Sequence, residues 1–139
     1  MIVISNKIRN FVNFQKLGYV ATVSSDNSPN LSPKGTIIVI DESHLAFADI
    51  RSPQTIENLR HNSSIEINVV DPIRRRGFRF KGQGQIISEG TQFSEILEQY
   101  KKNGIKSKIN AIVVVTAVSY THLRAHETEA DLVCRLLLE

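Results

Sequence analysis

The beginning of the chain carries the hydrophobic pattern of a short helix. Ile8, Phe11 and Val12 fall on one stripe of a helix with 3.6 residues per turn. Ser5 precedes this stripe, where a serine side chain can accept a hydrogen bond from an early backbone N–H. Gly18 follows it, at a place where helices often end in a left-handed residue. We therefore expect an amphipathic helix between Ser5 and Gly18.

Strand patterns dominate the rest of the chain. Ile65, Ile67 and Val69 alternate with polar residues, which is the period of a strand with one buried face. Other β-branched or apolar segments are separated by turn residues, and the first two pairs of segments read as antiparallel hairpins. The expected strands cover residues 19–24, a short stretch around Leu31, and residues 36–40, 45–48, 65–69, 78–87 and 111–118.

Two further short helices are expected between these strands. Ser52 and Pro53 form a helix-start signal, and a stripe from Phe93 to Tyr100 ends near Gly104. Six or so strands with short turns and brief helices favour an antiparallel barrel over a doubly wound sheet. The fold class is therefore mostly β (α+β), with residues 1–118 as one domain.

The last part of the chain, residues 119–139, does not continue this pattern. It follows the preceding strand without a turn signal, and it resembles a peptide translated from sequencing-adapter DNA at the end of a truncated reading frame. His122, His126, Glu127 and Cys134 could be interpreted as a metal site, because two histidines four residues apart share a helical face. We expect no metal there, and we expect the fold not to depend on this tail.

Composition and charge limit the class of protein. The apolar fraction of 41% and the charged fraction of 22% are ordinary for a soluble domain, and no apolar run reaches the roughly 20 residues of a membrane span. The N-terminus lacks a secretory pattern, and the single cysteine allows no internal disulfide, so we expect a cytoplasmic protein. The net charge of +3 favours an anionic partner without choosing between a phosphorylated small molecule and a nucleic acid.

One segment has the pattern of an anion site. A strand end delivers Arg51, Ser52 and Thr55 to the start of a helix, where unpaired N–H groups and the helix dipole stabilise an anion. Arg51 can make a bidentate contact with phosphate oxygens, and the two hydroxyls are further donors. The alternative interpretation is that Ser52 only caps the helix and Arg51 is a solvated surface charge.

Two other segments point in the same direction. Arg79 and Lys81 lie two apart on one strand, so they share a face that is either solvent-facing or aimed at an anion. The linker from Ser32 to Thr36 contains Gly35, which would let backbone donors come close to a flat ligand. Each segment taken alone is also compatible with a structural role.

Three sequence blocks together resemble the pyridoxamine 5'-phosphate oxidase-like family of FMN-binding split barrels. They are KLGYVATVSSDNSPNLSPKGT, FADIRSPQTIENLRHN and FRFKGQGQI, and the resemblance covers residues 5–118. It implies a six-stranded antiparallel split β-barrel that forms a homodimer with FMN at the interface. By this resemblance, Ser32, Lys34, Gly35 and Thr36 line the flavin ring, while Arg51, Ser52, Thr55 and Lys81 hold the phosphate. The expected cofactor-binding residues are Ser32, Pro33, Lys34, Gly35, Thr36, Asp49, Arg51, Ser52, Thr55 and Lys81.

The resemblance implies a flavoprotein, with an FMN-dependent oxidoreductase as the first hypothesis and a non-catalytic flavin carrier as the second. It does not extend to the residues that hold pyridoxamine phosphate in the true oxidase, so that activity is not implied. His44 and His61 are expected to be surface residues, and no catalytic residue is assigned. Nucleic-acid binding through residues 74–76 and Arg79 is disfavoured, because Phe78 and Phe80 alternate with the cations and point away from them.

Overall fold

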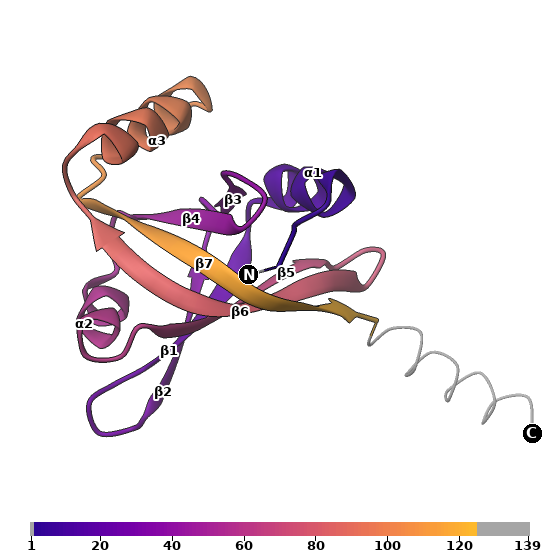
Figure 1. The fold of residues 1–139 in the computed structure, drawn as a ribbon, viewed down its shortest axis with the longest axis horizontal. Coiled ribbons are helices and arrows are strands. Elements are labelled where there is room, and N and C mark those ends of the chain that lie inside the picture. Colours follow the sequence, from indigo (N-terminus) through magenta and orange to yellow (C-terminus); the bar gives the residue numbers. More distant parts are fainter. Residues whose placement is uncertain (1, 125–139) are drawn as a thin grey trace, which may run out of the picture.

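The computed structural model of the chain describes residues 2–124. Within them, one curled antiparallel sheet is accompanied by three helices, so the α+β class is confirmed (Figure 1). The helices are α1 (Asn6–Gln15), α2 (Pro53–His61) and α3 (Thr91–Lys102). The strands are β1 (Gly18–Val23), β2 (Pro29–Lys34), β3 (Ile38–Val39), β4 (His44–Asp49), β5 (Ser64–Asp71), β6 (Arg76–Ile87) and β7 (Ala111–Leu123).

The described residues form seven strands, one in each segment expected from the sequence, whereas the family resemblance implies a six-stranded barrel. Their order in the sheet is β2-β1-β5-β6-β7-β4-β3, and every neighbouring pair is antiparallel. The shortest strand is β3, which covers only two residues of the expected stretch 36–40 and pairs with β4 at the edge of the sheet. Both expected hairpins, β1 with β2 and β3 with β4, are present.

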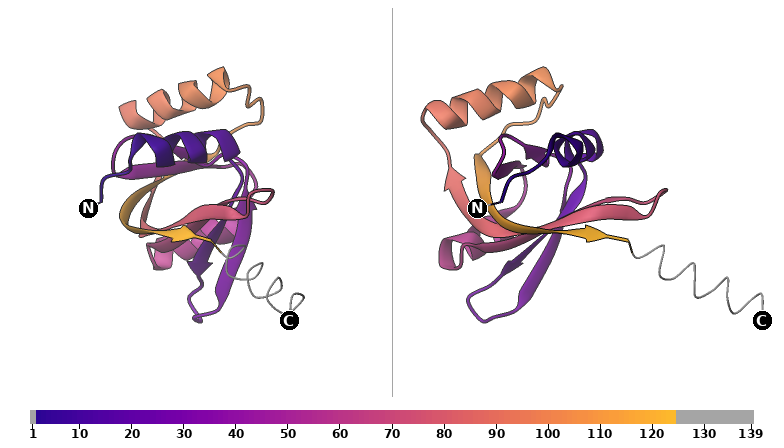
Figure 2. Two further views of the ribbon diagram at one scale, coloured as in Figure 1. Left: turned by 90° about the vertical axis from the view of Figure 1, so that its right-hand side faces the viewer. Right: turned by 45° about the vertical axis from the view of Figure 1, so that its right-hand side comes forward.

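The sheet buries apolar residues on both of its faces around β7. Val113, Val115 and Ala117 point into the main core inside the curl, which α1 closes with Ile8 and Val12. Ile112 and Val114 point to the opposite face, where they pack with Ile96 and Tyr100 of α3. In both views of Figure 2, α1 and α3 lie in the upper part of the molecule, with α3 above α1. The unbroken apolar run at the start of β7 follows from this burial on both sides.

Helix α1 begins where the sequence predicts it but ends differently. The Ser5 hydroxyl accepts a hydrogen bond from the N–H of Ile8 at 3.3 Å, which confirms the predicted cap. The left-handed residue at the end is Lys16, with a φ of 60°, and not Gly18. Gly18 instead begins β1, where a Cβ atom would lie 2.5 Å from the carbonyl oxygen of Asn68. Close backbone approach, rather than helix termination, is the reason for glycine at this position.

Strand β7 is longer than the sequence pattern predicts. It continues past residue 118 to Leu123, and its added residues pair with the stretch of β6 from Gly77 to Lys81. A β-bulge between Lys81 and Gly82 shifts the register there. His122 therefore lies in a strand, while His126, Glu127 and Cys134 lie outside the described residues. The domain boundary at residue 118 remains a prediction.

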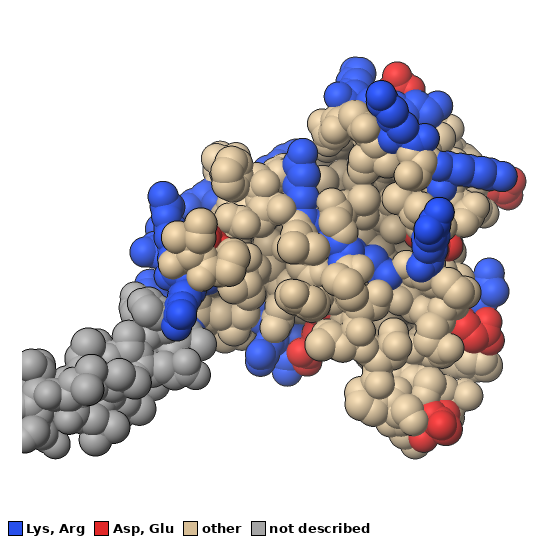
Figure 3. All heavy atoms as spheres, turned by 180° about the vertical axis from the view of Figure 1, so that it is seen from behind, with Lys and Arg blue, Asp and Glu red and all other residues tan. Residues whose placement is uncertain are grey.

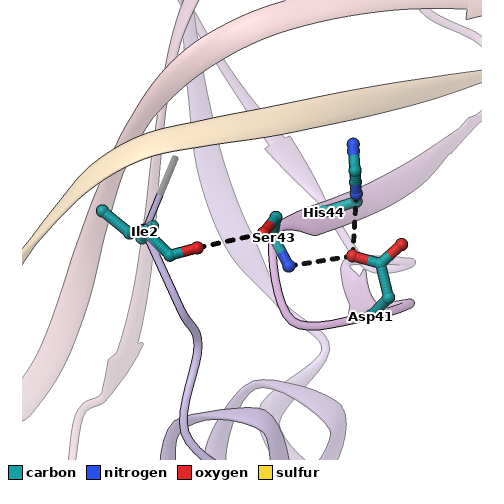
Figure 4. A network of polar contacts seen from close by, with 4 residues as sticks. All are labelled: Ile2, Asp41, Ser43 and His44. Atoms are coloured by element: carbon teal, nitrogen blue, oxygen red, sulfur yellow. Dashed lines mark hydrogen bonds and ion pairs between the residues drawn. The ribbon is translucent and has the colours of Figure 1, made fainter.

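A polar network holds the N-terminal segment against the β3–β4 turn (Figure 4). The Ser43 hydroxyl donates to the carbonyl of Ile2 at 3.0 Å, and the Ser43 N–H donates to Asp41 Oδ1 at 2.8 Å. His44 Nδ1 lies 2.7 Å from the same carboxylate oxygen. Partial burial acts to raise the pKa of Asp41, but the hydrogen bonds from Ser43 and His44 outweigh it and the pKa is lowered. His44 is thus a structural surface residue, as expected.

Candidate anion-binding site at the start of α2

The ends of β2 and β4 bring a buried lysine to the start of α2. Lys34, the last residue of β2, is only 7% exposed. Its ammonium group donates to Ser32 Oγ at 2.9 Å and to Ser52 Oγ. Burial lowers the pKa of Lys34, and the carboxylate of Asp49 opposes part of this shift. We call these four residues, Ser32, Lys34, Asp49 and Ser52, the lysine cluster.

Ser52 occupies the N-cap position of α2, as predicted, but its side chain does not cap the helix. The hydroxyl accepts from Lys34 instead, and the Ser52 N–H donates to Asp49 Oδ1 at 3.0 Å. The alternative interpretation, in which Ser52 only caps the helix, is therefore wrong for its side chain, because the hydroxyl accepts from the buried ammonium group instead. As a result, the N–H groups of Gln54 and Thr55 have no acceptor among the described residues.

Thr55 adds an unpaired buried group in the first turn of α2. It is 2% exposed, and its hydroxyl forms no hydrogen bond with the other described residues. Its neighbour Asn58 is equally buried but fully engaged, since it donates to Thr22 Oγ1 at 3.0 Å and accepts from Gln54 at 2.7 Å. Buried polar groups are almost always hydrogen-bonded, so the free hydroxyl and the free N–H groups fit a site that an anion completes.

Gly35 and Thr36 lie beside the lysine cluster but face α3. Gly35 has no heavy atom within 4 Å of the position that a Cβ would take, so the backbone is open to a ligand there. Thr36 Oγ1 accepts from the Ala48 N–H at 2.9 Å, and the Thr36 carbonyl accepts from the Tyr100 hydroxyl at 2.7 Å. Burial raises the pKa of Tyr100. Gly35, Thr36 and Tyr100 border a small cavity of about 230 Å³.

The remaining predicted residues are more exposed. Arg51 precedes α2 and has no side-chain partner among the described residues, and Pro33 is exposed on β2. Lys81 lies on the outward face of β6, with Nζ 3.5 Å from Glu66 Oε1. Arg79 shares that face and donates to Asn68 Oδ1 at 3.2 Å, as the spacing predicts. No contact described in residues 2–124 joins Lys81 to the lysine cluster, so their convergence on one phosphate stays a prediction.

The sequence reasoning did not select Asn58 or Tyr100. Asn58 lies three residues after Thr55, hence on the same face of α2, and this spacing was a usable signal. Tyr100 was assigned to an apolar stripe, because the pattern gives no sign that its hydroxyl reaches a carbonyl 64 residues earlier. Among residues 2–124 no group of His, Cys, Asp and Glu could hold a metal ion. No helix in the same span is long and apolar enough to cross a membrane.

A curled antiparallel sheet with helices at its mouth and edge defines a split-barrel protein. The profile of the family described as Pyridoxamine 5'-phosphate oxidase matches residues 4–127. The chain belongs to this family. A comparison with curated proteins gives no match.

Solved structures with this fold come from several proteins. HupZ of Group A Streptococcus is 27% identical with a TM-score of 0.78, and the match covers 88% of this chain and 95% of that chain. An FMN-binding protein from Syntrophomonas wolfei subsp. wolfei is 17% identical with a TM-score of 0.71, covering 84% and 83%. A structure described as an F420 reductase is 17% identical with a TM-score of 0.66, covering 85% and 98%. The last two likenesses show the fold alone.

Proposed function

We propose that this protein is an FMN-binding flavoprotein that grips the cofactor's phosphate at the start of α2. The observation that carries the proposal is the convergence of the buried Lys34 ammonium group with the uncapped N-terminus of α2. Membership of the pyridoxamine 5'-phosphate oxidase family supports flavin as the ligand. The FMN-binding protein of similar fold from Syntrophomonas wolfei is consistent with this choice.

The residues at the start of α2 have complementary roles in this proposal. Lys34 supplies a fixed positive charge, and its two serine partners hold the ammonium group in place. The N–H groups of Gln54 and Thr55 supply donors in the direction of the helix dipole. Arg51, exposed and unpaired within the described residues, adds a bidentate donor from the solvent side. Gly35 leaves room for the flat part of the ligand.

We propose that a second copy of the chain completes the site through the outward face of β1, β2, β5 and β6. Leu31, 68% exposed, and Tyr19 lie diagonally on this face, because Tyr19 pairs with Pro33 and Ala21 pairs with Leu31. Lys81, paired with Glu66, lies on the same face. An apolar patch beside opposite charges is suited to a self-complementary contact.

FMN, when bound, supplies hydride or single-electron transfer, so we propose an oxidoreductase. The role of the protein is to bind and orient the cofactor. His44 and His61 are both paired at the surface, with Asp41 and Glu57 respectively, and neither is proposed as a general acid or base. The alternative candidate is a flavin carrier that catalyses no reaction, which would bind the phosphate with the same residues at the start of α2.

The decisive experiment compares FMN with riboflavin, which lacks the phosphate. We expect FMN to bind at least about tenfold more tightly, because charge-assisted hydrogen bonds contribute roughly 1.5–3 kcal/mol each. Equal affinities would contradict the phosphate grip, and tighter binding of F420 than of FMN would contradict the choice of cofactor. Oxidation of reduced nicotinamide by the FMN-loaded protein separates the oxidoreductase from the carrier.

A further inference from the structure

A second cavity lies away from the lysine cluster, at the other end of the sheet. Its volume is about 760 Å³, and it is bounded by α1, by the turn between β5 and β6 and by the end of β7. No residue of α2 and no predicted cofactor-binding residue lines it. Sites for small organic ligands commonly have volumes of roughly 300–1,000 Å³. The cavity is therefore large enough for a ligand of its own.

The floor of this cavity is aromatic and fixed by the core. The ring of Phe78, buried on β6, meets Phe11 edge to face at a centroid distance of 5.2 Å and His122 at 4.8 Å. Phe14 follows Phe11 by three residues on α1 and lines the same cavity, yet it is 82% exposed. An apolar ligand seated on Phe11 and Phe78 would also cover Phe14.

The walls of the cavity carry an excess of positive charge. The side chains of Lys7 and Arg76 line it, and they form no ion pair or hydrogen bond with other described residues. Arg74 lies 3.9 Å from Asp71, the acidic residue of the lining, but Asp71 Oδ1 already accepts the N–H groups of Ile73 and Arg74. Figure 3 shows Lys and Arg side chains grouped at this end of the molecule. The unpaired cations complement an anion.

We propose that this cavity is a second binding site, for a small aromatic anion. Its flat apolar body lies against Phe11, Phe14 and Phe78, and its carboxylate or sulfonate group meets Arg76 and Lys7. Such a ligand makes apolar contacts with the aromatic side chains and ion pairs with the two cations at the same time. A single-stranded nucleic acid fits less well, because Phe78 is packed rather than presented as a stacking surface, and Arg79 lies on the opposite face of β6.

Calorimetric titration of the full chain with 1-anilinonaphthalene-8-sulfonate tests this site. We expect a single saturable site per chain whose affinity does not change when FMN is present in saturating amounts. The Arg76→Gln variant should bind the probe about fivefold to tenfold more weakly, because a charge-assisted contact is lost. Arg75→Gln is the matched control and should bind like the parent chain, since Arg75 directly precedes Arg76 in the chain but does not line the cavity.

The apolar part of the site has its own matched pair of variants. Phe14→Ala should weaken binding about threefold to tenfold through lost aromatic contact, whereas Leu17→Ala, at a residue after α1 that does not line the cavity, should not. Both side chains are exposed, so unchanged melting curves would show that the fold is intact. Displacement of the probe by FMN, equal effects of Arg75→Gln and Arg76→Gln, or loss of binding only with Leu17→Ala would each overturn the proposal. Displacement by single-stranded DNA that depends on Arg75 would assign the turn to nucleic acid instead.

Discussion

The two ends of the sheet present positive charge in opposite ways. At the start of α2, Lys34 is buried, held by two hydroxyls and placed near Asp49. At the α1 end, Lys7 and Arg76 are exposed, unpaired within the described residues, and set around an aromatic floor. A buried, oriented cation interacts strongly with a compact anion because little water screens it, but its desolvation destabilises the free protein. Exposed cations stay hydrated, so they destabilise the free protein little, but they discriminate less between anions.

The sharpest test of this comparison is Lys34→Met. FMN affinity should fall by roughly 1.5–3 kcal/mol, or about tenfold to 150-fold, because the fixed charge-assisted contact is removed. The unfolding free energy of the apo-protein should stay the same or increase, since a buried charge is replaced by an apolar side chain of similar length. Binding of 1-anilinonaphthalene-8-sulfonate in the second cavity, which we call the aromatic cavity because Phe11, Phe14 and Phe78 line it, should not change. Fluorescence titration with FMN and thermal melting measure these effects.

The pH dependence of stability gives an independent control for Lys34. Because the pKa of Lys34 is lowered in the folded state, folding is accompanied by loss of a proton at alkaline pH. The apo-protein should therefore gain stability as the pH rises from the lowered value toward the ordinary lysine pKa, and Lys34→Met should lack this gain. If the stability of both proteins depends on pH in the same way, then the pKa of Lys34 is not lowered in the folded state.

The second prediction contrasts Arg51 with Arg75. Both are exposed arginines, but Arg51 precedes α2 and Arg75 lies in the β5–β6 turn. Arg51→Ala should weaken FMN binding by about tenfold, at the low end of the range for a charge-assisted contact because Arg51 is exposed. Arg75→Ala should leave FMN affinity unchanged. Neither variant should shift the melting temperature of the apo-protein measurably.

If both variants titrate alike with FMN, the phosphate site at the start of α2 is wrong. The family membership would then describe the fold without describing the function, because function depends on particular sites and not on the fold.

A third prediction concerns the aromatic end of the molecule. A chain ending at residue 118 loses the part of β7 that pairs with Gly77 to Lys81 and places His122 against Phe78. It should keep the fold and FMN binding, but melt about 5 °C or more below the full chain and lose probe binding in the cavity. A chain ending at Arg124 should behave like the full chain in both assays. Equal melting temperatures for all three would confirm the domain boundary predicted at residue 118.

Local patterns predicted most of the fold because hydrophobic period and turn chemistry are encoded within each segment. Ser5 caps α1 and the alternation in β5 reports a buried face, as expected. The sequence could not predict that the Ser52 hydroxyl turns away from its helix, because its competitor, Lys34, comes from a strand 18 residues earlier. The length of β7 was also missed, since its last residues are stabilised by pairing with β6 rather than by their own composition.

The smallest predicted effect concerns the Asp41–Ser43–His44 network, which lies outside both sites. It tests whether ligand binding depends only on the residues of the two sites. The pKa of Asp41 is lowered in the folded state, so its carboxylate contributes stability above the ordinary carboxylate pKa of about 4, and this contribution is lost as the pH falls through the lowered value. Because the His44–Asp41 pair is partly exposed, Asp41→Asn should reduce the unfolding free energy at pH 7 by less than about 1 kcal/mol. The variant should also show a shallower loss of stability below pH 4, as measured by urea unfolding at several pH values. FMN affinity and probe affinity should both remain those of the parent chain, since Asp41 lines neither the lysine cluster nor the aromatic cavity. A change in either affinity would mean that the N-terminal segment and α1 transmit strain across the sheet, and the two ends could then no longer be treated as independent.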